Sequence, residues 1–379
     1  MRTTLTENKC KVLVFVVTGC TYFFSDLYLF SLFHSKQEIN SLPLNTSTPA
    51  NPCYVSPYCV LSIKNLFLDH SNFYVHEVVA RYIKQICNMS HDWMFITPDM
   101  ISFGHIGFAF LGSKLVCSDS LGIRRLGVAF FELRNFMDAM DGTLARARMS
   151  SRTSITEPIS KTIAANNENV YTTPREVMHN SFFGRKAGYY IDGICDGIGC
   201  LALFCACFLY LKNHRFRRRL SYQPLSLVMS TRNGIKSDAA PNNGNKLTCG
   251  RKNGLLCSRI SELQESAGRG LPVIFFGIVS LISSIFWNLN INRYTKFFTP
   301  VQDNHKTLHG SVLQSFDMWL IITSWRVFNP QALIEMLLAA IFIDRLQDFV
   351  YLMQYFGSFF VCATIGITEV HYWGLEFKV

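Results

Sequence analysis

The chain has 379 residues, of which 49% are hydrophobic and only 16% are charged. Soluble proteins carry about 25% charged residues, so this composition excludes an ordinary soluble domain and predicts a polytopic membrane protein. The formal net charge of +10 would suit a nucleic-acid partner, but the basic residues concentrate at 212–259, between hydrophobic segments. The positive-inside effect explains that placement, and we therefore expect no nucleic acid to bind.

The first predicted element is a membrane span over residues 12–33, which is as long as the roughly 20 residues that one crossing needs. Lys9 and Lys11 precede it, and no small-residue cleavage site is obvious, which favours a retained anchor over a cleaved signal peptide. The basic flank places the N-terminus in the cytosol. Residues 1–33 are therefore assigned to a cytosolic N-terminus and a membrane anchor.

The next segment, residues 34–98, is expected to form a lumenal loop. Two N-glycosylation sequons, which begin at Asn45 and Asn88, agree with that side of the membrane. Within the loop, residues 64–95 alternate apolar and polar residues in a helix-like way, without enough apolar length to cross. They predict an interfacial helix ahead of the membrane domain.

The membrane domain is expected to cover residues 99–379 and to begin with a hairpin of two spans, 100–117 and 122–140. Basic residues around the turn place that turn in the cytosol. The far end of the second span then faces the lumen. A polar, Ser/Thr-rich lumenal insertion follows at 141–187.

A further span at 188–211 ends in a cluster of basic residues, which fits a cytosolic exit. A basic cytosolic loop at 212–270 and a span at 271–288 come next. Pro330 interrupts the following apolar stretch, which is either one broken helix or two short ones. The remaining apolar runs are 317–328, 331–344 and 348–367. The sequence thus predicts an all-α polytopic bundle, with seven spans as the central estimate.

Four aspartates stand at helical spacings at the lumenal ends of two of these spans. Asp138 and Asp141 are three residues apart, and Asp192 and Asp196 are four apart, so each pair shares one face of a helix. A carboxylate at the membrane is costly and marks a functional site by default. Four carboxylates favour a hard cation, Mg²⁺ or Mn²⁺, held against phosphate groups. Helix capping is the structural alternative, with Asp141 near a helix end and Asp192 near a helix start.

Small residues and one arginine accompany these aspartates at fixed spacings. They are Gly142, Ala145, Arg146 and Gly188. In this order, the aspartates, the small residues and the arginine resemble the signature of the CDP-alcohol phosphotransferase family. Residues 147–187 depart from it, because the family has a much shorter spacer there. The expanded spacer, the N-terminal anchor and the lumenal loop together most resemble the ceramide phosphoethanolamine synthases of invertebrates.

The resemblance implies a six-helix membrane core, in addition to the anchor, and a reaction in which a lipid hydroxyl attacks the β-phosphorus of a CDP-alcohol and releases CMP. It implies that Asp138, Asp141, Asp192 and Asp196 bind the metal ions, and that Asp196 is also the general base.

For the substrate-binding residues, the resemblance implies that Gly142, Ala145 and Gly188 let the nucleotide approach the helix backbones. Arg146 would pair with a phosphate or balance the acidic cluster. For the glycines alone, helix packing is the stronger explanation.

The substrates implied are CDP-ethanolamine and ceramide, a membrane lipid, in the Golgi apparatus with the site facing the lumen; a homodimer is left open. An ethanolamine- or cholinephosphotransferase that acts on diacylglycerol is the alternative enzyme. A membrane transporter that uses the aspartates as a cation site is the alternative from another class.

Three further features have open roles. His105 lies within a span, where a packed, hydrogen-bonded histidine is more common than a ligand. Arg134 precedes Asp138 by four residues, which predicts either a structural pair between the two or an effect of the arginine on the Asp138 pKa. Residues 147–187 form a lid over the site, shape the entrance for the lipid acceptor, or are a tolerated surface loop.

Overall fold

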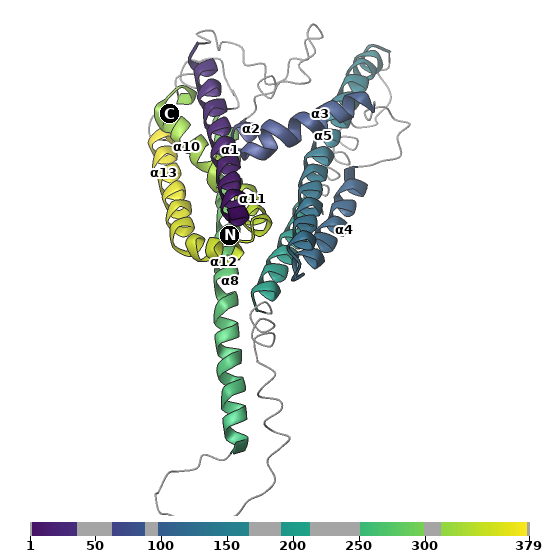
Figure 1. Ribbon diagram of the computed structural model, residues 1–379. Coiled ribbons are helices and arrows are strands. Elements are labelled where there is room, and N and C mark those ends of the chain that lie inside the picture. Colours follow the sequence, from purple (N-terminus) through teal and green to yellow (C-terminus); the bar gives the residue numbers. More distant parts are fainter. Residues whose placement is uncertain are drawn as a thin grey trace, which may run out of the picture.

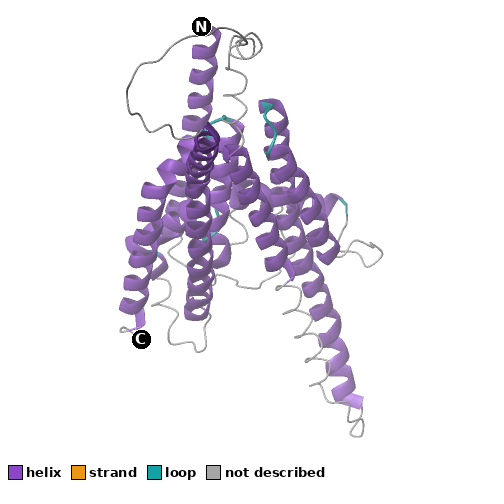
Figure 2. Cartoon of the chain, turned by 90° about the horizontal axis from the view of Figure 1, so that it is seen from below, coloured by secondary structure: helices purple, strands orange, loops and turns teal. Residues whose placement is uncertain are grey.

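The computed structural model describes residues 2–35, 63–87, 98–166, 191–212, 251–298 and 312–376. Within these ranges every regular element is a helix and no strand is present (Figure 2). The prediction of an all-α protein is therefore confirmed. The sequons and Gly188 lie outside the described residues.

Three helices in the described part of the chain are long and apolar enough to cross a membrane: Ile191–Lys212, Gly270–Phe298 and Leu346–Glu376. Shorter apolar helices cover Val16–Leu32, Met100–Val116 and Pro330–Phe342. The chain is thus a polytopic helical membrane protein, as predicted. The total of seven spans stays a prediction.

The N-terminal part begins with helix α1 (Arg2–Ser35), which contains the predicted anchor. After the gap come α2 (Ile63–Leu66), η2 (Asn72–His76) and α3 (Glu77–Ile86). These short helices lie across the molecule between α1 and α5 (Figure 1). The segment that was predicted as an interfacial helix is therefore helical over most of its length, and its last helix packs against α5.

The predicted hairpin consists of α4 (Pro98–Val116) and α5 (Leu121–Asn166). Helix α5 does not end near Asp141, as the capping alternative supposed, but continues to Asn166. The residues after Asp141 include Leu, Ala, Arg and Met, which have high helix propensity, so the loss of hydrophobicity does not end the helix. Helix capping therefore does not explain Asp138 or Asp141.

In the second half of the chain, one helix is longer at both ends than the predicted span. Helix α8 (Arg251–Phe298) starts inside the predicted cytosolic loop and extends beyond the predicted span at 271–288. The sequence did not predict the first part of α8, because its residues are polar and hydropathy detects only the part of a helix that crosses the membrane.

The apolar stretch around Pro330 forms two helices, α10 (Phe316–Phe328) and α11 (Pro330–Phe342). The Asn329 side chain between them accepts a hydrogen bond from the Ala332 amide at 2.7 Å and caps α11. The chain then continues as α12 (Leu346–Leu352), η4 (Met353–Gly357) and α13 (Ser358–Glu376).

Helix α1 is attached to the core by a buried ion pair. Asp26 accepts hydrogen bonds from the Arg326 guanidinium of α10 and from the Tyr74 hydroxyl of η2, the latter at 2.7 Å. His70 Nε2 lies 2.8 Å from the other Asp26 oxygen. Arg326 is fully buried, and its guanidinium carbon lies 4.4 Å from the centre of the Phe73 ring. The helix that contains the predicted N-terminal anchor is therefore part of the packed fold.

Candidate metal and substrate site

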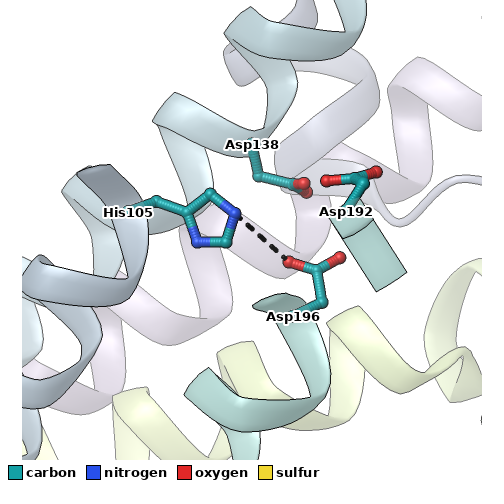
Figure 3. A group of neighbouring side chains, drawn as sticks. All are labelled: His105, Asp138, Asp192 and Asp196. Carbon is teal, nitrogen blue, oxygen red and sulfur yellow. Dashed lines mark ion pairs between the residues drawn. The ribbon is translucent and has the colours of Figure 1, made fainter. Parts of the chain in front are cut away.

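Three of the four predicted aspartates meet a histidine at one point. His105, Asp138, Asp192 and Asp196 point toward one another (Figure 3), and their ligand atoms all lie within 4.8 Å of one another. His105 comes from α4 and Asp138 from α5, while the other two aspartates lie in the first turns of the helix Ile191–Lys212. We call these four residues the acidic cluster.

Close packing of three helices places the acidic cluster. A Cβ atom on Gly127 of α5 would lie 2.8 Å from the carbonyl oxygen of Gly112 on α4, so only glycine fits there and the two helices approach closely. A Cβ atom on Gly199 would lie 3.3 Å from the Ala109 Cβ of α4. Small residues thus bring the helix Ile191–Lys212 against α4 as well, and the cluster residues face the junction.

His105 is fully buried, and neither ring nitrogen has a hydrogen-bond partner among the described residues. Its Nε2 atom lies 4.0 Å from Asp196 Oδ1, beyond hydrogen-bonding distance. Asp192 Oδ1 is likewise buried and without a partner in the described part of the chain. Buried polar atoms are normally satisfied. These orphan atoms beside two further carboxylates fit a cation shared by the cluster.

Arg134 pairs directly with one carboxylate of this cluster. It is 1% exposed and donates a hydrogen bond to Asp196, and its Nη1 donates to Asn135 Oδ1 at 3.0 Å. Asn135 in turn donates to Glu335 Oε1 of α11 at 2.9 Å. The predicted pair of Arg134 with Asp138 is therefore replaced by a pair with Asp196 on another helix. One arginine beside three carboxylates leaves room for further positive charge.

Asp141 has a different environment from the other three aspartates. Its Oδ2 accepts a hydrogen bond of 2.6 Å from the Ser102 hydroxyl, and the residue is buried. It lines the same cavity as the acidic cluster but is not among the four side chains that meet there.

The predicted nucleotide-binding residues follow on the next turn of α5. Arg146 Nη2 donates to both oxygens of Glu77 on α3, at 2.7 and 3.0 Å, and to the Thr143 hydroxyl at 3.1 Å. Gly142 lines the cavity, and a Cβ atom there would meet only Arg146, at an ordinary 3.5 Å. Packing therefore does not require glycine at 142. Ala145 is half-buried on the same turn.

A cavity of 1180 Å³ borders the aspartates of the site together with Gly142 and Arg146, whereas His105 lies behind its wall. Its polar wall includes Lys64 of α2 together with Arg134, Asp138, Asp192 and Asp196. Its apolar wall is formed by the helix Ile191–Lys212 and by α8, with side chains such as Phe204, Phe208, Val273 and Ile274. A space with one charged wall and one apolar wall suits an amphiphilic substrate.

Comparison with known proteins agrees with this geometry. The family model for ceramide phosphoethanolamine synthase matches residues 35–161, 177–250 and 263–377. These ranges include every residue of the aspartate signature. The chain belongs to the ceramide phosphoethanolamine synthase family. A ceramide phosphoethanolamine synthase of Drosophila melanogaster is 32% identical over 321 residues, which are 84% of this chain and 69% of that protein. No solved structure matches significantly.

Several residues of this family member's site carry no local signal in the sequence. His105 was interpreted as a packed histidine, whereas the structure places it in the acidic cluster. Lys64, Glu77 and Ser102 reach the site from α2, α3 and α4. Glu77 and Ser102 lie 69 and 39 positions from their partners Arg146 and Asp141 on α5, and Lys64 lines the same cavity from a separate helix. Only the tertiary fold could identify them.

Proposed function

We propose that this chain transfers phosphoethanolamine from CDP-ethanolamine to the primary hydroxyl of ceramide and releases CMP. The observation that carries the proposal is the family membership, combined with three signature aspartates that meet at the wall of a large cavity. Membership of an enzyme family also removes the support for the transporter alternative.

The acidic cluster fits a divalent cation, because it offers three carboxylates and an imidazole with orphan polar atoms. A bound cation would neutralise the pyrophosphate charge of the donor. An imidazole among the donors favours Mn²⁺, a transition metal, over Mg²⁺, which takes oxygen ligands. Asp138, Asp192, Asp196 and His105 are the proposed ligands, and Asp141 is one turn away.

Side chains of the protein would accept the proton of the attacking hydroxyl and orient the base that accepts it. Asp196 is proposed to take the proton of the ceramide hydroxyl. A bond then forms between that oxygen and the β-phosphorus, the phosphoanhydride bond breaks, and CMP leaves with the bonding electrons. Arg134 supports this role by holding the Asp196 carboxylate in one orientation.

The nucleotide is proposed to lie against the turn of α5 that carries Gly142, Ala145 and Arg146. Gly188, four residues before Asp192 in the sequence, is proposed to contact the nucleotide as well. Lys64 adds a positive charge from α2 on the same cavity wall. These residues support a phosphate-binding end of the cavity, because a guanidinium and an ammonium both pair with phosphate oxygens.

The proposed location is the Golgi membrane, with the acidic cluster facing the lumen. Arg124 and Arg125 lie at the turn between α4 and α5, and Arg124 binds Asp344 at the turn between α11 and α12 at 2.5 Å. From Arg124 to Asp138 the chain advances about 21 Å along α5. A basic turn remote from the cluster supports a cytosolic turn and a lumenal cluster. We also propose that the protein forms a homodimer, which a measurement of its molecular mass in detergent would test.

The test is headgroup transfer by the purified chain in detergent with Mn²⁺. CDP-ethanolamine and CDP-choline are each offered ceramide and diacylglycerol, and an Asp196→Asn variant with unchanged thermal stability is the control. Transfer from CDP-ethanolamine to ceramide that the variant loses supports the proposal. Transfer only to diacylglycerol overturns the acceptor and supports the alternative enzyme. No transfer by folded protein overturns the proposed reaction.

A further inference from the structure

The wall of the cavity that α8 provides carries a polar residue at every fourth position. These residues are Ser280, Ser284, Asn288 and Asn292, and we call them the polar stripe. A spacing of four keeps side chains on one helix face. The stripe lies in the part of α8 that is apolar enough to cross a membrane, where polar side chains are costly unless they are used.

Exposure rises along the polar stripe. Ser280 is 5% exposed, Ser284 is half-buried, and both asparagines are exposed. The stripe therefore leads from the interior of the cavity to its mouth.

Ser280 has a hydrogen-bonding capacity that the described residues do not fill. Its Oγ atom is buried and has no partner among them, although a serine within a helix usually bonds back to the carbonyl four residues earlier. Ser283, on another face of the same helix, donates to the Phe328 carbonyl oxygen at 2.6 Å. A buried hydroxyl without a partner that lines a cavity points to a partner from the ligand.

Helix packing places the buried end of the stripe beside the reacting centre. A Cβ atom on Gly270 would overlap the Phe208 ring, and one on Gly277 would lie 3.5 Å from the Phe204 ring. Helix α8 and the helix Ile191–Lys212 therefore run antiparallel. If this register continues for two more turns, Ser284 is level with Asp196, and Ser280 is one turn deeper along the apolar wall.

We propose that Ser280 and Ser284 bind the amide group of the acceptor lipid and so select ceramide over diacylglycerol. The inference rests on the proposed function, because it assumes that the acceptor lipid occupies this cavity. In ceramide an amide N–H and a second hydroxyl lie next to the reacting hydroxyl, and both can donate to a serine oxygen. Diacylglycerol has ester oxygens there, which donate nothing. With diacylglycerol the serine hydroxyls can only donate, so their acceptor lone pairs stay unfilled and the hydrogen bonds from the ceramide N–H and hydroxyl are lost.

The first part of the test needs no variant. Wild-type protein is given CDP-ethanolamine with ceramide, N-methylceramide or diacylglycerol, and kcat/KM is measured for each. N-methylceramide keeps the hydroxyls and chains of ceramide but has no amide N–H to donate; its extra methyl group is the reason that the serine variants of the second part are needed. We expect ceramide to be preferred over N-methylceramide by about five-fold or more, the value of one hydrogen bond. Equal use of the two overturns the amide assignment.

The second part uses Ser280→Ala/Ser284→Ala, with Ser283→Ala as the matched control on the same helix. We expect the double variant to lose the preference for ceramide over N-methylceramide and to lower the ratio of ceramide to diacylglycerol by about five-fold. Ser283→Ala should lower the thermal stability and leave both ratios unchanged.

The two proposals fail in different ways. Transfer to ceramide with wild-type ratios in the double variant overturns the role of the polar stripe and leaves the proposed function intact. Absence of transfer to ceramide by the wild-type protein overturns the proposed function itself.

Discussion

The guanidinium of Arg134 binds the carboxylate of Asp196, although the two residues lie on different helices and 62 positions apart in the chain. Arg134 is 1% exposed, whereas Asp196 keeps 36% of its side chain open to the cavity. The arginine is therefore a buried support, and the aspartate is the member of the pair that a substrate can reach.

This pair predicts that Arg134→Lys lowers kcat much more than it changes the KM values for both substrates. A lysine keeps the charge but cannot hold a carboxylate with a planar fork, so we expect kcat to fall by at least about 10-fold. Steady-state kinetics on purified protein measure the effect. Arg125→Lys, at the remote turn of α5, serves as the control and should behave as wild type. A change in KM alone would show that Arg134 does not position Asp196.

The position of His105 predicts a change in metal preference. In His105→Asn the imidazole is replaced by an amide oxygen, so we expect the apparent affinity for Mn²⁺ to fall by about 10-fold or more and the ratio of activities with Mn²⁺ and Mg²⁺ to fall. Binding of Mn²⁺ to the protein without substrate, followed by electron paramagnetic resonance, gives a readout independent of turnover. His371→Gln, beside Tyr294 and away from the cluster, is the control. Unchanged Mn²⁺ binding would leave His105 as a packing residue.

The bond between Arg146 and Glu77 allows two roles of the arginine to be separated. If Arg146 binds a phosphate of the donor, Arg146→Ala should raise the KM for CDP-ethanolamine by about 10-fold, while Glu77→Gln should change it little. If the arginine only fastens α3 to α5, the two variants should have equal effects. Initial rates at varied CDP-ethanolamine, with ceramide held constant, distinguish these outcomes.

The ion pair between Asp26 and Arg326 predicts a large loss of stability on removing one partner. Asp26→Asn leaves a fully buried arginine without its countercharge, which costs about 3–5 kcal/mol. We expect a lower midpoint of thermal unfolding in detergent, with kcat per folded molecule close to wild type. The double variant Asp26→Leu/Arg326→Met should recover part of the lost stability, because no buried charge remains. A double variant as unstable as Asp26→Asn would contradict this account.

Helical spacing paired Asp138 with Asp141 and Asp192 with Asp196. The structure brings three of these four aspartates together and leaves Asp141 hydrogen-bonded to Ser102 instead. His105 could not be predicted, because a histidine in an apolar run looks the same whether it packs or binds a ligand. Its partner Asp196 is 91 positions away, and no sequence pattern reports a contact of that range.

For the fold, too, the sequence predicted some features and missed others. Hydropathy located the apolar parts of α8, α10 and α11, and Pro330 was identified as a break. It did not locate the polar continuation of α5 after Asp141 or the polar start of α8 at Arg251. Helix length there depends on propensity and packing rather than on the thickness of a membrane.

The contact between α1 and α10 sets an order for the assembly of this protein. Asp26 and its partner Arg326 are 300 residues apart, and at about 5–20 residues per second the ribosome needs roughly 15–60 s to make the intervening chain. During that interval the arginine that pairs with the Asp26 carboxylate has not yet been made. Among its partners in the described part of the chain, only His70 and Tyr74, which follow Asp26 by 44 and 48 residues, are then available to bind it.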